Sequence, residues 1–228
     1  MRSITTALTA AAALALAGTS NAAVVFDAQN SGGFFTPFNS GNAATVKYGD
    51  GGWLSNFGTD TYNLTRITLR LATFSGDGIT PGTTDLNFTF NNGDPSGLVF
   101  GPGTTLYSTT ITNVALPANA PGFANFFDIE IPLPNIITSG GFNNIGWSIG
   151  LSNYNYSGQF GVQTSGFQAV GFFTQNASFF NGTSWSLFSF GGGNAANFAA
   201  LVEGFVVPAP GAVGVMGLAG VMALRRKR

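Results

Sequence analysis

Apolar and polar residues alternate with a period of two through much of this chain, and that pattern predicts β-strands. Ile67, Leu69 and Leu71 would face one side of a strand, while Thr68 and Arg70 would face the other. The same alternation recurs in residues 86–90, 127–131 and 145–151. Because one face of each segment is apolar and the other polar, we expect half-buried strands.

Turn-forming residues separate these segments and set the fold class. Gly, Asn, Pro and Asp cluster at residues 75–78, 81–82, 91–95, 101–103, 140–141 and 191–193. Further strands are expected at residues 104–116, 158–163, 184–190 and 197–206, and residues 30–41 are expected to form an irregular loop. No amphipathic helical pattern interrupts this order. The sequence therefore predicts an all-β protein, an antiparallel β-sandwich or jelly-roll-like domain over residues 23–206.

The composition excludes several function classes. The chain has no cysteine and no histidine, so it can form no disulfide and cannot use Ser-His-Asp or Cys-His catalysis. Residues 23–206 contain three basic residues, Lys47, Arg66 and Arg70, against nine acidic ones, a formal charge of −6. Nucleic-acid binding is not expected, because it needs clusters of Lys and Arg.

The N-terminal 22 residues have the features of a secretory signal peptide. Arg2 gives a short basic start, and a mostly apolar run follows from Ala7 to Ala17. Ser20 and Ala22 are small residues at the positions that signal peptidase reads, so cleavage would leave Ala23 as the first residue. We therefore expect export through the Sec translocon.

The C-terminal segment, residues 207–228, combines a short motif, an apolar run and a basic cluster. Val207, Pro208, Ala209 and Pro210 form the motif, and the run extends from Gly211 to Leu224. Counted from Val206, the uncharged stretch has 19 residues, about 28 Å as a helix, against a hydrocarbon core of about 30 Å. The chain then closes with the basic residues Arg225, Arg226, Lys227 and Arg228. The positive-inside rule places this cluster in the cytoplasm and the body outside.

This tail resembles a PEP-CTERM sorting signal, with Ala209 where Glu is usual, in a variant associated with planctomycete-type bacteria. The resemblance implies recognition by an exosortase, a membrane-embedded cysteine transpeptidase, and removal of the tail near the motif. It also implies a Gram-negative-type bacterium that makes exopolysaccharide. The protein would be held transiently in the inner membrane and then pass to the cell surface or extracellular matrix.

The body resembles PEP-CTERM ectodomains of unknown role in the order of several short motifs. These are residues 91–94, 102–106, 147–149, 184–187 and 197–198. The resemblance implies a β-sandwich and no established activity. We therefore expect a non-enzymatic protein of the surface or matrix, with a carbohydrate-binding module for matrix polysaccharide as the alternative.

Acidic and amide side chains in the turns raise the question of calcium, which takes oxygen ligands. Asp77 with Asp85, or Asn91 with Asp94, would supply such ligands from neighbouring loops. The same residue types also favour turns for local reasons, so both interpretations stay open. No other cofactor is expected.

Aromatic residues offer a possible sugar platform, because pyranose rings pack on aromatic faces. Tyr154 and Tyr156 lie in a polar stretch and are expected to be exposed, with Trp185 as a further member. Trp147 lies on an alternating apolar face, which indicates the core. Asp128 and Glu130 share one face of a strand, about 7 Å apart, but that face is opposite the core and solvated, so no catalytic residue is assigned.

Overall fold

The described part of the chain folds into two antiparallel sheets. The computed structural model describes residues 22–29, 33–38, 44–55, 60–78, 80–98, 103–138, 144–173, 177–188 and 196–207. These residues form strands, turns, bends and irregular segments, and none of them is helical. The strands are β1 (Ala23–Asp27), β2 (Phe35–Pro37), β3 (Lys47–Trp53), β4 (Thr61–Phe74), β5 (Gly82–Asn92), β6 (Thr104–Leu116), β7 (Asn125–Ile137), β8 (Asn144–Asn155), β9 (Gln159–Ser165), β10 (Phe172–Phe173), β11 (Ser178–Phe180), β12 (Trp185–Leu187), β13 (Asn197–Phe198) and β14 (Ala200–Val207).

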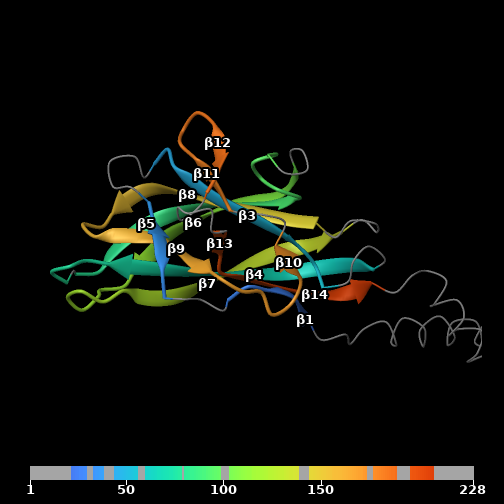
Figure 1. Cartoon of the computed structure of the whole chain (residues 1–228), viewed down its shortest axis with the longest axis horizontal. Helices are drawn as coiled ribbons and strands as arrows, with labels where there is room; N and C mark the ends of the chain where they lie inside the picture. The colour runs from blue at the N-terminus through green and yellow to red at the C-terminus, as the bar shows by residue number, and fades with distance from the viewer. Residues whose placement is uncertain are drawn as a thin grey trace, which may run out of the picture.

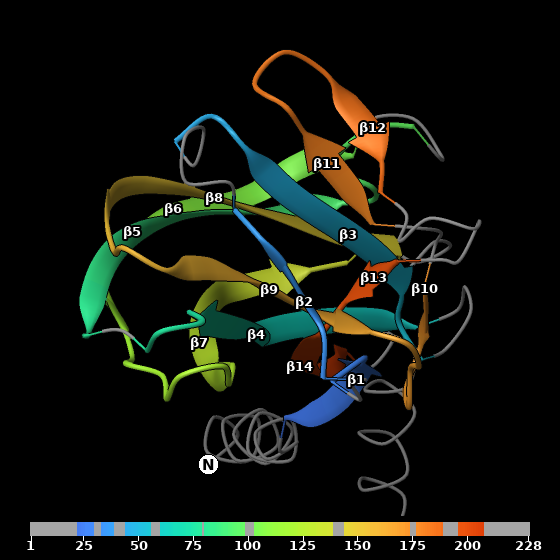
Figure 2. The same ribbon diagram turned by 60° about the vertical axis from the view of Figure 1, so that its left-hand side comes forward.

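Each sheet is built around one long central strand. In the β4 sheet, the strand order is β1-β14-β4-β9-β13, with β7 also paired to β4 and β2 to β9. In the β8 sheet, the order is β12-β11-β3-β8-β5-β6, with β10 paired to β3. The two sheets form the two layers seen in Figures 1 and 2. The predicted all-β, sandwich-like architecture is confirmed.

The core between the sheets comes from the alternating faces that the sequence indicates. Ile67, Leu69 and Leu71 of β4 are fully buried, and Trp147 of β8 is 1% exposed. Ring packing connects the layers, since Phe26 of β1 meets the edge of Trp147 at 5.7 Å between ring centroids. At roughly 25 cal/mol per Å² of buried apolar surface, packing of this kind is the main stabilising term in a chain without disulfides.

Several local expectations differ from the structure. Residues 30–41 contain β2, which pairs with β9, so the prediction of an irregular loop there is wrong. The strand expected at residues 184–190 is shorter, running from Trp185 to Leu187. β1 and β3 were not predicted. β3 is rich in glycine and shows little alternation, yet it pairs with seven consecutive residues of β8.

The first and last described strands are neighbours. Ala23 of β1 pairs with Gly204 of β14, and β14 runs on to Val207. Figure 1 shows β1 beside the end of β14 at one end of the molecule. Within the described ranges, no helix is long and apolar enough to cross a membrane.

Candidate functional site

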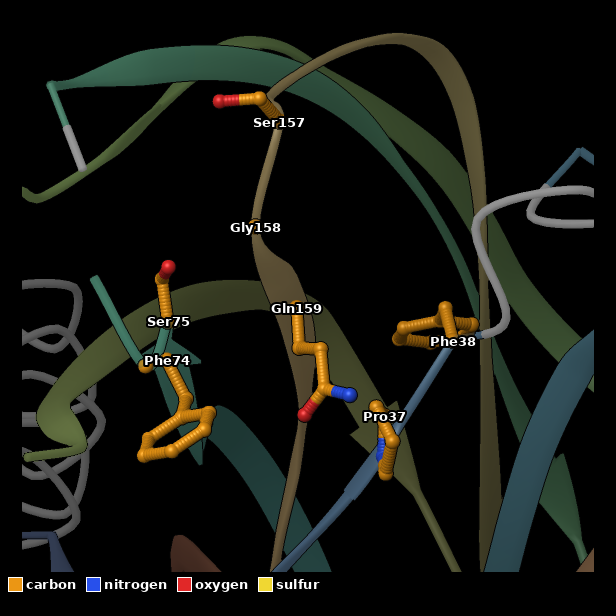
Figure 3. Close-up of a pocket in the computed structure, with 8 residues that line it drawn as sticks. Pro37, Phe38, Phe74, Ser75, Ser157, Gly158 and Gln159 are labelled. Carbon is orange, nitrogen blue, oxygen red and sulfur yellow. The ribbon is translucent and has the colours of Figure 1, made fainter. Parts of the chain in front are cut away.

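A pocket of about 310 Å³ lies where three strand ends meet. Pro37 of β2 pairs with Gly161 of β9, and Phe74 at the end of β4 pairs with Gln159 at the start of β9. These pairings place the end of β2, the turn after β4 and the turn before β9 around one opening. The lining residues are Pro37, Phe38, Phe74, Ser75, Gly76, Ser157, Gly158 and Gln159, as Figure 3 shows.

Glycine at position 161 allows this arrangement. A methyl group there would meet the backbone oxygen of Thr36 and would stand 2.6 Å from Pro37 Cα. Because both contacts are with backbone atoms, the close approach of β2 to β9 requires glycine. The pocket wall therefore depends on one residue of β9.

The walls of the pocket are aromatic and neutral. Phe38 is 2% exposed and forms part of the core, where it stacks on Phe160 at 5.9 Å. Phe74 is half-buried and packs against Phe35 at 6.3 Å. The side chain of Gln159 lies between Phe74 and Pro37 in Figure 3. No lining residue carries a titratable side chain. The pocket is thus suited to a small uncharged ligand that offers both apolar faces and hydrogen-bonding groups.

The three aromatic residues predicted to bind sugar are not brought together. Tyr156 is buried, so the expectation that it is exposed is wrong, and its hydroxyl donates to Asn119 Oδ1 at 3.1 Å. Tyr154 is half-buried against Tyr156, and its hydroxyl donates to the backbone oxygen of Gly158 at 2.8 Å. Burial, with a smaller effect of Tyr156, raises the pKa of Tyr154 to about 12. Neither tyrosine is among the residues that line the pocket, although Tyr154 holds the backbone of the lining residue Gly158.

Trp185 lies far from these tyrosines. It is on β12 at the edge of the β8 sheet, with β11 and β3 between it and β8, about 14 Å away across the strands. Its ring packs on Phe180 at 5.3 Å. The prediction of a core position for Trp147 is confirmed, since that residue is 1% exposed.

Of the four residues considered for calcium, Asp85, Asn91 and Asp94 are buried, and Asp77 is exposed. Asp94 accepts hydrogen bonds from the backbone N–H and the hydroxyl of Ser96, two residues on. Asn91 is buried in β5 opposite Gly146. Asp77 lies on the exposed turn after β4. Among the residues that the structure describes, no three His, Cys, Asp or Glu side chains are grouped closely enough to hold a metal ion.

Asp85 has a structural role that its sequence neighbours did not indicate. Its Oδ1 accepts from the backbone N–H of Asn113 at 2.8 Å, and its Oδ2 accepts from Asn153 Nδ2 at 2.6 Å. Both asparagines have positive φ, 56° and 50°. The register of β5 shifts against β6 and against β8 at this point. One carboxylate therefore holds two β-bulges, one on each neighbouring strand. These hydrogen bonds, Asn113 first, lower the pKa of Asp85.

Sequence analysis missed Asp50, a carboxylate that links the two sheets. It is 2% exposed on β3, and its oxygens accept from the backbone N–H groups of Gly51 and Phe198, both at 2.7 Å. Because Phe198 is on β13, this contact joins the β8 sheet to the β4 sheet. Burial raises the pKa of Asp50 well above its usual range, the two N–H donors oppose that shift, and the charge of Asp94 adds to it. The flanking glycines of Asp50 are typical of a turn, so no sequence signal indicated a buried strand position.

Asp128 and Glu130 lie on the exposed face of β7, as predicted, and pair with arginines of β4. Arg70 Nε is 3.1 Å from Asp128 Oδ1, and Arg66 Nη1 is 2.7 Å from Glu130 Oε2. Arg66 also pairs through Nε with Glu203 of β14. These residues form an ion-pair ladder across the outer face of the β4 sheet.

The predicted processing and anchor residues lie outside the described part of the chain, apart from two at its borders. Ala22 is the first described residue, and Val207 is the last residue of β14. Ser20 and the remaining tail residues, Pro208, Ala209, Pro210, Gly211, Leu224, Arg225, Arg226, Lys227 and Arg228, are not described.

The described chain is thus an all-β protein of two antiparallel sheets with one neutral pocket described above. No family model and no curated protein matches it. Solved structures of infectious bursal disease virus show a weak similarity. The Gt strain structure is 13% identical with a TM-score of 0.25, covering 83% of this chain and 41% of that chain. The Gx strain structure is 12% identical with a TM-score of 0.29, covering 86% and 44%. The chain spans less than half the length of these viral chains, and scores this low carry no argument about function.

Proposed function

We propose that this protein is a secreted, non-enzymatic protein of the cell surface or extracellular matrix, sorted through its C-terminal tail by an exosortase-type system. Residues 1–22 would be the signal peptide, residues 23–206 the jelly-roll-like ectodomain and residues 207–228 the sorting segment with its hydrophobic helix. Signal peptidase, the Sec translocon and the exosortase would be its processing partners. The host would be a Gram-negative-type bacterium, and the protein would stay in the inner membrane until it is processed.

One observation carries this proposal: the folded body fits between the two predicted signals. β1 begins at Ala23, the residue that the expected cleavage would leave first, and β14 ends at Val207, directly before Pro208. Removal of residues 1–22 or of residues 208–228 would therefore leave every described strand intact, and a cut before Val207 would take only the last residue of β14. Both terminal segments could be removed without loss of core residues, and this supports the proposal that the chain is a precursor that is processed at both ends.

Chemistry within the body supports a non-catalytic role. The lining of the pocket has no titratable side chain, and general acid–base catalysis needs such a group within hydrogen-bond reach. Asp50, Asp85 and Asp94 accept hydrogen bonds that hold loops and strands. These residues act in structure, which favours display or binding over turnover.

A stop codon after Val207 tests the sorting proposal without touching β14. We expect the shortened protein to fold, to miss the cell surface and to escape the mass change that follows tail removal in the full chain. A matched variant, Pro208→Ala with Pro210→Ala, keeps the apolar run and alters only the motif. Surface delivery and mature mass equal to those of the full chain, measured by cell fractionation and mass spectrometry, would refute sorting through the tail.

The pocket favours carbohydrate binding as a second function. A neutral pyranose presents apolar C–H faces and hydroxyls, which match the ring of Phe74 and the amide of Gln159. A glycan array followed by calorimetric titration would test this. We expect Gln159→Ala and Phe74→Ala to weaken binding, while Gln168→Ala, a residue outside the pocket lining, should not. Equal loss in all three variants, or no glycan bound, would contradict the assignment.

A further inference from the structure

The end of the β4 sheet next to the tail carries apolar side chains on its solvent side. Phe205 of β14 and Ile137 of β7 both pair with Asn63 of β4, so the two apolar residues share the outer face and flank a single asparagine. Ile137 is 55% exposed. Strands lie about 4.8 Å apart, so these two residues stand about 10 Å apart on either side of Asn63.

Val24 of β1 extends this surface to the edge of the sheet. It pairs with Glu203 and is 40% exposed, and it lies diagonal to Phe205 on the same face. Val206 is 45% exposed, but it pairs with the buried Tyr62 and so lies on the opposite side of the sheet. We call Val24, Ile137 and Phe205 the apolar rim. It spans β1, β14 and β7 with β4 between them.

Charged residues lie next to the rim on the same outer face of the β4 sheet. Arg66 pairs with Glu203 and Glu130, and Arg70 pairs with Asp128 further along β4. The outer face is therefore apolar at the end of β14 and ionic beyond it. A surface that changes from apolar to charged over one or two residue pairs matches the polarity gradient of a membrane interface.

The chain itself indicates what covers the rim. The structure places Val206 and Val207 in β14, so the helix counted from Val206 must be shortened: the uncharged stretch beyond the strand runs from Pro208 to Leu224, 17 residues or about 26 Å as a helix. Only Val206 and Val207 separate Phe205 of the rim from that stretch, so a membrane-held tail would bring the rim to the lipid surface. The residues of the rim are uncharged, so anionic lipids would not repel this end of the acidic body.

We propose that the apolar rim docks on the lipid headgroup interface while the tail is anchored, which fixes the orientation of the body. This inference rests on the proposed membrane-held precursor and adds a second contact to it. Docking would place Pro208 to Pro210 at a defined depth, where a membrane-embedded transpeptidase can reach them.

The same orientation sets the direction of the pocket. Phe74 is at the opposite end of β4 from Thr61, which pairs with Val207. Fourteen residues of strand separate the two ends, about 40 Å at the usual rise per residue. A docked rim therefore turns the pocket away from the membrane, toward the matrix.

Because the chain has no cysteine, single-cysteine labelling gives a direct test. Ile137→Cys and Phe123→Cys probe the two ends of β7, since Ile137 ends that strand and Phe123 lies just before it; both side chains are strongly exposed. The full chain, labelled with bimane at one site, is reconstituted into phosphatidylethanolamine–phosphatidylglycerol vesicles that carry a nitroxide near the headgroup. Val24→Cys serves as a second rim probe.

We expect the label at positions 137 and 24 to lose most of its fluorescence and the label at position 123 to be unaffected. Vesicle flotation of the same samples reports the anchor separately. Flotation without quenching at position 137 overturns docking and leaves the anchor in place. A full chain that does not float overturns the anchor and the docked orientation together. Equal quenching at 137 and 123 would mean that the body has no fixed orientation, which also overturns docking.

Discussion

Asp50 and Asp85 are both carboxylates with little exposure, yet their surroundings shift their pKa values in opposite directions. Asp50 is buried between the sheets, and desolvation of its charge raises its pKa. Asp85 accepts hydrogen bonds from Asn113 and Asn153, and these lower its pKa. The free energy of unfolding should therefore fall with rising pH through the contribution of Asp50 and rise with pH through the contribution of Asp85.

For Asp50, the folded protein holds a proton more tightly than the unfolded chain. Stability contributed by this group is present below the unfolded pKa, about 3.9, and is lost as pH rises toward the folded value. We expect Asp50→Asn, which cannot ionise, to gain stability relative to the natural protein as pH increases above about 4. Urea unfolding of both proteins across this range measures the difference. A constant difference, or one of opposite sign, would show that the N–H groups of Gly51 and Phe198 keep Asp50 ionised.

For Asp85, the contribution to stability changes with pH in the opposite direction. The folded state favours the ionised form, so its contribution is present above about pH 3.9 and is lost as pH falls through the lower folded pKa. We expect Asp85→Ala to be clearly destabilised at neutral pH, because both bulges lose their acceptor, and to approach the natural protein in acid. Asp77→Ala, at an exposed turn, should change the unfolding free energy by no more than about 0.5 kcal/mol. Equal effects of the two substitutions would contradict the bulge role.

At the scale of elements, the alternation rule works where a strand has one apolar and one polar face. β4 meets that condition, and its predicted apolar face, Ile67, Leu69 and Leu71, is buried. β8 does not: its predicted apolar face is buried, but residues 145–151 are all buried. The prediction of a half-buried strand is wrong there, because the loop of Gly93 and Pro95 lies against Gly146 on the other face. β3 does not meet that condition either, since glycine supplies little pattern and its pairing partner is far along the chain. The pocket gave no sequence signal at all, because Pro37, Phe74 and Gln159 meet only through the pairing of β2, β4 and β9.

The β2–β9 contact provides a test at this scale. Gly161→Ala places a methyl group against the backbone of Thr36 and Pro37, so β2 must move and the pocket wall moves with it. We expect a loss of about 1–3 kcal/mol, typical of overpacking. Gly166→Ala is a matched control, since nothing lies within 4 Å of its added carbon, and should change stability by less than about 0.5 kcal/mol. Urea midpoints compare the two. If the Gly161→Ala protein is as stable as the control, β2 moves to accommodate the methyl group with no loss of stability, which would contradict this prediction.

On the scale of the whole molecule, the first and last described strands pair with each other and complete the β4 sheet. β1 pairs with β14, and β14 covers the edge of β4 from Thr61 to Leu69. The chain therefore cannot complete the β4 sheet until its last strand is available. The position at which the folded domain ends can therefore be measured by truncation.

Two truncations locate that boundary. A chain that stops after Val207 keeps every described strand, and we expect cooperative unfolding with a midpoint close to that of the full chain. A chain that stops after Ala199 loses β14, including Ala200 and Val202, which are fully buried. It leaves a long edge of β4 unpaired and leaves β1 with only the bridge from Asp27 to Val170. Burial of Val202 alone is worth about 1.5–3 kcal/mol, and β1, which carries the buried Val25 and Phe26, loses its strand partner as well. Together these losses are a large part of the 5–15 kcal/mol that holds a typical domain together. Near-ultraviolet circular dichroism during urea titration should then show no cooperative transition. A cooperative transition in the shorter chain would mean that β1 and β14 lie outside the folding unit, and the boundary at Val207 would have to be abandoned.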